Sequence, residues 1–509
     1  MSTVALPSQK FTPKDSLTNL LSRKLRQRTL LGTILLLCAG LRIYHLGTAS
    51  LWSDEIFSRY YIDLFGLHFA LHQGLALETN PPTYYLLLRG WMALWGHTEA
   101  ALRSLSALVS VLCIPFLYLL GRELAGKWRG LLAALLFALC PTSVYFAQEA
   151  RAYALLMLSG AILLWAAAVF QRDARSTRAA VTYVLAGTLC LYLHATGLLF
   201  VAACGAAVWL YLVRRGRRGR RALAKWTALN VAVMLLGVPY YSHAFAASQS
   251  GIINYVPPAG LHQFLYSISL AVSGIVTPYP WPGLLLAAAF LLVLGISLCL
   301  NPVPARATVT LLGVPCLFVA FVFVVSMRRP ILLPRTLVWL IVPLCVLAAR
   351  QILVGRIARY VVLLTTMVAF GAGLFFQLTR PNSDKEPLRD VVQALSPGIE
   401  HAGLVVLSPS SDPMVLAYYA PQVRNVRVWD SAANHTIFGA EGRSAHLQSI
   451  SEAEILQAIR ANESVVLVSH SFDLDRLNDL RRQAPATSYR EWSCGKVVCV
   501  AAAVWQPAR

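Results

Sequence analysis

Long apolar segments separated by short polar ones occupy residues 30–377 of the 509-residue chain. An α-helix rises about 1.5 Å per residue, so a segment of some twenty apolar residues crosses the ~30 Å core of a bilayer. The pattern therefore predicts roughly eleven membrane-spanning helices. They are expected near residues 30–46, 102–120, 131–146, 152–170, 181–194, 198–213, 227–243, 283–300, 307–326, 336–349 and 360–377.

The loop after the first span contains two amphipathic pieces between Trp52 and His97. The second piece runs from Asn80-Pro81-Pro82 to Trp95 and could itself be a span, but that assignment would reverse the charge bias of every later loop. Its Trp and Tyr side chains suit the level of the lipid headgroups. We therefore expect it to lie along the outer interface as a helix.

Basic residues mark alternate loops, most strongly at residues 214–221. Such loops face the cytoplasm in membrane proteins, which predicts an N-terminus inside and a C-terminus outside. With 57% hydrophobic and 13% charged residues, the composition is not that of a soluble protein. The net charge of +21 does not indicate nucleic-acid binding, because nine of the 23 acidic but 32 of the 44 basic residues precede residue 384, between spans.

From about residue 381 the pattern changes to short strands and helices. The runs 404–407 and 465–468 are typical of strands, and Ser451 stands three residues before Glu454, the spacing of a helix capping box. We expect a cytoplasmic segment at 1–28, a transmembrane part at 29–380 and a small α/β domain outside at 381–509. That domain has no Gly-rich phosphate loop, so we expect no nucleotide there.

The ten cysteines fall into two groups. Eight lie inside apolar runs without metal-ligand spacing and are most simply explained as small core residues. Cys494 and Cys499 flank the turn of an expected terminal hairpin, where the sequence leaves a disulfide open.

The positions of the acidic residues limit which carboxylates can take part in a reaction at the outer face. The membrane half has nine, and none lies between 174 and 383. Six are predicted outside, all in the first two outer loops; they are Asp54, Glu55, Asp63, Glu78, Glu99 and Glu149. The adjacent pair Asp54-Glu55 directly after a span indicates a functional site, the alternative being a solvated loop that starts a helix.

Several short motifs in the membrane half together resemble the bacterial GT-C glycosyltransferases, relatives of the protein O-mannosyltransferases and the lipid A aminoarabinose transferase. They are Ser53-Asp54-Glu55, Asn80-Pro81-Pro82, Arg103-Ser104, the stretch from Gln148 to Leu155, and Pro334-Arg335. The resemblance covers the membrane half, and the tail matches no motif. It implies a fold of many helices with two interfacial ones in the first loop, and a donor sugar carried on polyprenyl phosphate.

The resemblance places the catalytic base at Asp54. A carboxylate there would take the proton of an acceptor hydroxyl as it attacks the sugar, a step typically worth a factor of ~10² to 10⁴. Glu55 and Glu149 complete the catalytic candidates. Glu55 points another way on a helix or strand, so we expect it to hold a neighbouring arginine or to orient the loop. For Glu149, a helix cap with its own ion pair is the alternative.

The substrate-binding candidates are mainly arginines. Arg103 and Arg335 lie at outer ends of spans, where they either snorkel to headgroups or grip the donor phosphate as a fork. By the resemblance, Arg151, Tyr153 and Asn80 join them. Asn80 departs from relatives that have Lys or His at this position, which shifts the phosphate charge to the arginines or indicates another donor.

We expect neither a cofactor nor a divalent metal. His68 and His72 have the spacing of a metal pair, but their apolar neighbours favour an interfacial helix. His194 lies at the outer end of a span. We expect it to hydrogen-bond the end of that helix rather than to act as a ligand.

Together the residues predict a polytopic α-helical glycosyltransferase of the bacterial inner membrane. It would move a sugar from polyprenyl phosphate to a lipid, glycan or protein of the envelope at the periplasmic face, with membrane lipids and no nucleic acid as further partners. A flippase for lipid-linked sugars is an alternative, although the spans after residue 174 offer no acid for ion coupling. A scaffold without catalytic activity is another.

Overall fold

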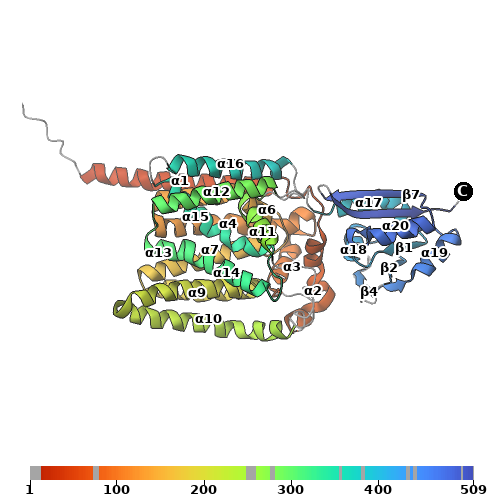
Figure 1. Cartoon of the computed structure of the whole chain (residues 1–509), viewed down its shortest axis with the longest axis horizontal. Coiled ribbons are helices and arrows are strands. Elements are labelled where there is room, and N and C mark those ends of the chain that lie inside the picture. Colours follow the sequence, from red (N-terminus) through yellow and green to blue (C-terminus); the bar gives the residue numbers. More distant parts are fainter. Residues whose placement is uncertain are drawn as a thin grey trace, which may run out of the picture.

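The protein has two parts, a long helical bundle and an α/β domain at one end of it (Figure 1). The computed structural model describes residues 13–72, 80–247, 260–274, 281–354, 358–379, 385–430, 436–438, 444–494 and 497–507. Most helices of the bundle run along the longest axis of the molecule. We call the end of the bundle nearest the C-terminal domain the domain end.

Each predicted span falls on a helix. The bundle contains α1 (Pro13–Ile43), α4 (Glu99–Ala125), α5 (Lys127–Leu139), α6 (Pro141–Ala147), α7 (Tyr153–Arg172), α8 (Thr177–Leu193), α9 (Gly197–Arg214), η2 (Gly216–Gly219), α10 (Arg220–Ala247), α12 (Trp281–Leu300), α13 (Ala305–Thr308), η3 (Val309–Gly313), α14 (Val314–Ser326), η4 (Pro334–Leu340), α15 (Ile341–Ile352) and α16 (Ala358–Thr379).

The number of spans depends on how short and broken helices are counted. By length and composition, eight helices in the described part of the chain can cross a membrane, and a ninth is added if α5 and α6, bent by 58°, form one span. The predicted spans outside this set are α1 and the 17-residue α8. The polytopic helical fold is thus confirmed, and the count of eleven stays a prediction.

One helix was not predicted. Residues 244–282 lie between two predicted spans, and α11 (Leu261–Ser273) lies within them and ends at Gly274 in the left-handed conformation. Its last turn is buried against the bundle, including Leu270, Ala271 and Val272. The sequence did not predict this helix, because its 13 residues are too few to cross a membrane and its flanks are rich in proline.

Two helices of the first loop lie at the domain end, as predicted. They are α2 (Ser53–His72), broken at Gly66 where φ is 71°, and α3 (Thr83–Trp95). Figure 1 shows α2 running across the direction of the long helices. The first turn of α2 therefore brings Asp54 and Glu55 to the end of the bundle.

The break between α5 and α6 is held by the buried side chain of Arg42. Its guanidinium donates to the carbonyls of Phe137 (3.2 Å) and Ala138 (2.6 Å) and to the hydroxyl of Ser143 (2.7 Å). The last carbonyls of a helix lack partners within it, and Pro141 cannot supply one. Arg42 thus satisfies the end of α5 and fixes where the next turn, with Gln148, approaches the end of α1.

The C-terminal domain is built on a mixed sheet of order β5-β2-β1-β6-β8-β7. The strands are β1 (Leu404–Leu407), β2 (Val426–Trp429), β5 (Gln448–Ile450), β6 (Val465–His470), β7 (Ser488–Cys494) and β8 (Val497–Trp505), with β3 (Thr436–Phe438) and β4 (Ser444–His446) as a separate pair. The first four in the sheet are parallel, and β7 and β8 form an antiparallel hairpin at its edge.

Helices cover both faces of this sheet, which explains the continuous apolar runs of β1 and β6. Val405 and Leu407 face α17 (Leu388–Ile399) and α18 (Met414–Tyr419), in a core continuous with that of the bundle. Leu404 and Val406 face the opposite core, with α19 (Glu452–Arg460) and α20 (Leu474–Gln483). The predicted capping box is present at the start of α19.

The cysteines agree with the prediction in part. Cys494 and Cys499 form a disulfide across the β7–β8 hairpin. Of the eight free cysteines, six are buried, but Cys299 and Cys316 are exposed on the bundle surface, so they are not core residues. An apolar run alone cannot distinguish a lipid-facing position from a buried one, because both are apolar in a membrane protein.

Replacing Arg42 by Ala should destabilise the bundle strongly. The buried carbonyls at the end of α5 would lose their donor, at a cost of roughly 3 kcal/mol. We expect a clearly lower apparent melting temperature of the detergent-purified protein, while the exposed Arg122→Ala is neutral. Equal melting temperatures for the two variants would contradict this role.

Candidate active site

Three elements far apart in the chain converge at the domain end around Asp54. Asp54 lies in the first turn of α2, Arg151 precedes α7 and Arg335 begins η4. The Asp54 Oδ2 atom is 3.0 Å from Nη1 of Arg335 and 3.8 Å from Nη2 of Arg151. The Asp54 side chain is 33% exposed, so this carboxylate faces an accessible space with a guanidinium on either side.

Glu55, the next residue, points into the protein and pairs with Arg103. Both side chains are fully buried, and the guanidinium binds both carboxylate oxygens, at 2.8 and 2.6 Å. The Ala150 N–H also donates to Glu55 (2.8 Å). Burial alone would raise the pKa of Glu55, but Arg103, Lys385 and these hydrogen bonds outweigh it and lower the pKa to about 2. Glu55 is therefore ionised and structural rather than a proton carrier.

The contacts of Arg103 differ from those expected of an arginine that binds phosphate or snorkels to headgroups. Besides Glu55, its guanidinium donates to the carbonyls of Leu46, Ala49 and Ser50 in the first loop. A guanidinium has five N–H donors, and these contacts use all of them. Arg103 is thus not placed to grip a phosphate or to snorkel. It fixes the loop that leads into Asp54.

Glu149 is buried beside this pair and faces Lys385. Its Oε1 atom lies 3.2 Å from the Lys385 ammonium, and both side chains are at most 3% exposed. The ammonium also lies over the rings of Trp52 (6.0 Å) and Tyr145 (5.2 Å). Sequence reasoning missed Lys385. No local pattern marks it, because its partner is 236 positions earlier in the chain.

Arg151 links Asp54 to the remaining candidates. Its Nη1 donates to the hydroxyls of Ser58 (3.1 Å) and Tyr85 (3.3 Å) and to the Asp54 carbonyl (3.3 Å). A small cleft beside it is lined by Asn80, Pro81, Tyr84, Tyr85, Ala152, Tyr153, Leu193 and His194. Asn80 and Tyr153 thus share a cleft with Arg151, and the Asn80 Oδ1 accepts from the Ala195 N–H (3.4 Å).

His194 also lines this cleft, and hydrogen bonds fix its side chain. Its Nδ1 lies 2.8 Å from the Thr196 hydroxyl, which also accepts from the indole of Trp339. The side chains of His68 and His72 lie outside those that the structure describes.

A large apolar cavity lies among α11, α12, α14 and α15. Its volume is about 790 Å³, and the lining includes Phe264, Leu291, Val319 and Leu344. Leu340, the last residue of η4, also lines it, while Arg335 lies at the other end of the same short helix. The short helix η4 thus contributes Arg335 to the site around Asp54 and Leu340 to the lining of the cavity.

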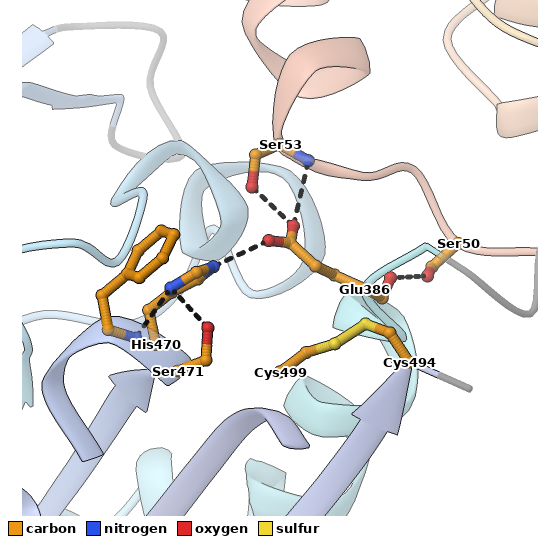
Figure 2. Close-up of a disulfide and its surroundings, with 8 residues drawn as sticks. Ser50, Ser53, Glu386, His470, Ser471, Cys494 and Cys499 are labelled. Atoms are coloured by element: carbon orange, nitrogen blue, oxygen red, sulfur yellow. Dashed lines mark hydrogen bonds and ion pairs between the residues drawn. A yellow bond between two sulfur atoms is a disulfide. The ribbon is translucent and has the colours of Figure 1, made fainter. Parts of the chain in front are cut away.

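The C-terminal domain contacts the first loop directly. Tyr418 donates to the His97 carbonyl (2.6 Å), the Tyr419 hydroxyl accepts from the Leu51 N–H (2.7 Å), and Arg389 pairs with Glu99 (3.2 Å). Figure 2 shows Glu386 reaching Ser53, the first residue of α2, with His470 on its other side. The carboxyl end of the parallel strands thus abuts the loop that carries Asp54.

Removing one partner of the Glu55–Arg103 pair should be severe. A buried charge left without its partner costs roughly 3–5 kcal/mol, whereas a surface pair contributes less than about 1 kcal/mol. We expect Glu55→Gln and Arg103→Ala to lower the apparent melting temperature sharply. Asp63→Asn, which breaks the partly exposed Arg59–Asp63 pair on the same helix, should change it little. A small loss in Glu55→Gln would show that the pair does not fix the loop.

Asp412, near Glu386 and Asp54, should make stability depend on pH. Burial raises its pKa to about 7, and those two carboxylates add to the rise. Since the unfolded pKa is lower, the folded protein binds the extra proton between about pH 4 and 7, and stability falls as pH rises through that range. We expect Asp412→Asn to melt higher than wild type at pH 8, with the gap narrowing as pH falls and closing only near pH 4. The exposed Asp475→Asn is the control, and a gap independent of pH would contradict the assignment.

Residues 79–243, about a third of the chain, match the family model described as dolichyl-phosphate-mannose-protein mannosyltransferase. No curated protein matches the chain. Among solved structures, ArnT from Cupriavidus metallidurans bound to undecaprenyl phosphate aligns over 93% of this chain and 97% of its own, with 14% identity and a TM-score of 0.58. The Archaeoglobus fulgidus oligosaccharyltransferase aligns over 90% of this chain and 70% of its own, with 13% identity and a TM-score of 0.51.

These neighbours are GT-C glycosyltransferases. At such low identities the alignments bear on the fold, and they extend from the bundle into the C-terminal domain. The resemblance drawn from the membrane motifs is therefore confirmed: the chain is a multi-pass membrane protein with the fold of the GT-C glycosyltransferases.

Proposed function

We propose that this protein transfers a sugar from a polyprenyl-phosphate donor to an acceptor of the cell envelope, with Asp54 as the general base. The observation that carries the proposal is the position of Asp54, a partly exposed carboxylate whose Oδ2 atom lies within 4 Å of both Arg335 and Arg151. A base and a phosphate-binding pair of arginines are the two elements that this transfer needs.

The charges around Asp54 fit a phosphodiester. The buried pairs Glu55–Arg103 and Glu149–Lys385 each sum to zero. The three side chains Asp54, Arg151 and Arg335 together carry one positive charge. A sugar linked to polyprenyl phosphate carries one negative charge, so the donor balances the site, and Arg forks suit its oxygens.

The reaction then follows from the geometry. Both ion pairs of Asp54 use Oδ2, so we assign Oδ1 to take the proton of the acceptor hydroxyl. The acceptor oxygen forms a bond to the anomeric carbon as the bond from that carbon to the phosphate oxygen breaks. The phosphate leaves with the electron pair and gains a negative charge, which Arg335 and Arg151 stabilise. A phosphate leaving group does not require a general acid.

We assign the donor tail to the apolar cavity. Arg335 and Leu340 lie at opposite ends of η4, so a lipid in the cavity could place its phosphate at Arg335. The name of the matching family and the ligand of the Cupriavidus ArnT structure support a polyprenyl phosphate. We propose that the arginines take the charge-balancing role of a divalent metal, so that the protein needs none.

We propose that the site faces the periplasm of a bacterial inner membrane. Figure 1 shows the turn between α9 and α10, which holds the arginines of residues 214–221, at the end away from the C-terminal domain. Basic loops favour the cytoplasmic side, so the domain end with Asp54 would lie outside. A lipid, glycan or protein of the envelope would then approach Asp54 from that side.

Envelope mass spectrometry tests this proposal. We expect a deletion strain, Asp54→Asn and Arg335→Gln each to lose the same single sugar mass from one glycan, glycolipid or protein, because base and phosphate binding are both required. Asp63→Asn is the matched control, since it also lies on α2 and its carboxylate is likewise 33% exposed, but it is outside the site. All variants are compared at equal membrane levels.

Retention of the sugar in Asp54→Asn, with its loss in the deletion, would overturn Asp54 as the base. It would then favour the flippase or scaffold alternative, in which the fold is needed and the carboxylate is not.

A further inference from the structure

The helix that carries Asp54 begins without a side-chain cap from the chain before it. The first N–H groups of a helix lack partners within it and are usually met by a nearby Ser, Thr, Asp or Asn. The residue before α2 is Trp52, whose indole is a donor only. The Trp52 carbonyl accepts from the Glu55 and Ile56 N–H groups, whereas the Ser53 N–H uses an acceptor from elsewhere.

That acceptor is Glu386, 333 positions later in the chain. Its Oε2 accepts from the Ser53 hydroxyl (2.6 Å) and from the Ser53 N–H (3.3 Å). A carboxylate at this position also favours the positive end of the helix dipole, an effect worth roughly 0.3–1 kcal/mol and more when partly buried. Glu386 thus does for α2 what a local cap residue does for an ordinary helix.

Glu386 is itself fixed by the C-terminal domain. His470, at the end of β6, lies 3.1 Å from its other oxygen, and Ser50 donates to its backbone carbonyl (2.9 Å). Burial alone would raise the pKa of Glu386, but the contacts with His470 and Ser53 outweigh it and lower the pKa, so the group is ionised. Figure 2 shows this chain of contacts from His470 through Glu386 to Ser53.

We propose that Glu386 is a positioning residue through which the C-terminal domain caps α2 and holds Asp54 toward Arg335 and Arg151. The proposal rests on the function proposed above, with Asp54 as the base. Asp54 directly follows the capped residue, so the direction of its side chain depends on the backbone of this first turn. The negative charge of Glu386 also disfavours a turn of Asp54 toward the domain.

A purely docking role is the competing explanation, and the chain offers a control for it. Arg389, in the first turn of α17, donates to Glu99 and to the Thr48 carbonyl, neither of which belongs to α2. Arg389→Ala therefore removes one docking contact and leaves the contact between Glu386 and Ser53 in place, whereas Glu386→Ala removes the cap itself. Glu386→Gln keeps an acceptor oxygen for Ser53 without the charge.

The first measurement is hydrogen exchange of the full-length protein in detergent, followed by mass spectrometry. We expect peptides covering residues 53–60 to exchange faster in Glu386→Ala than in wild type, with α4 and α7 unchanged. Arg389→Ala should leave these peptides protected, and Glu386→Gln should restore most of the protection. Unchanged exchange in Glu386→Ala would overturn the cap.

The second measurement is the amount of the sugar product in cells at equal membrane levels. We expect Glu386→Ala to reduce it about tenfold or more, since small misplacements of a catalytic group are costly. Ser53→Ala should reduce it less, and the double variant no further than Glu386→Ala, because both act through one contact. Additive losses would overturn the shared contact.

Two further outcomes separate this proposal from the function on which it rests. If Glu386→Ala exchanges faster but keeps full product while Asp54→Asn loses it, the cap is structural and the positioning role is overturned. If Asp54→Asn itself keeps the product, the proposed function fails, and positioning of a base fails with it, whatever the exchange shows.

Discussion

The buried ion pair of Glu55 and Arg103 is the interaction on which the domain end of the protein depends. It joins the first turn of α2 to α4, and the remaining donors of Arg103 bind the carbonyls of the loop between α1 and α2. Glu55 in turn accepts the Ala150 N–H and so ties in the turn before α7. A pair that is dry and fully hydrogen-bonded fixes geometry even where its net contribution to stability is small.

The adjacent residues Asp54 and Glu55 make different contacts at this site. Because successive side chains of a helix point in different directions, Glu55 turns into the protein and Asp54 toward the accessible space. Glu55 is neutralised by its own arginine, which leaves Asp54 to interact with Arg335 and Arg151. The site therefore combines a buried, charge-balanced ion pair with a partly exposed carboxylate that contacts two arginines.

The C-terminal domain belongs to this arrangement rather than standing apart from it. Just before α17, Lys385 pairs with Glu149 and Glu386 accepts a hydrogen bond from Ser53. On α18, the Tyr419 hydroxyl accepts from the Leu51 N–H in the loop before α2. The core under β1 continues into the core of the bundle. In the described residues, the carboxyl end of the parallel strands gathers Asp412 and His470 next to the helix that carries Asp54.

The sequence by itself determined the helical membrane fold, the two helices of the first loop and the strands β1 and β6, because hydrophobic runs are local signals. It also singled out Asp54-Glu55 as candidates, because charges in apolar surroundings are a local signal too. It could not determine which arginine meets which acid. Arg103 and Arg335 look alike at the ends of spans, and only the tertiary arrangement of α2, α4 and η4 decided that Arg103 pairs with Glu55 while Arg335 reaches Asp54. Lys385 and Glu386 carry no local signal at all. Their partners lie hundreds of positions away, so their roles were decided by where the C-terminal domain docks.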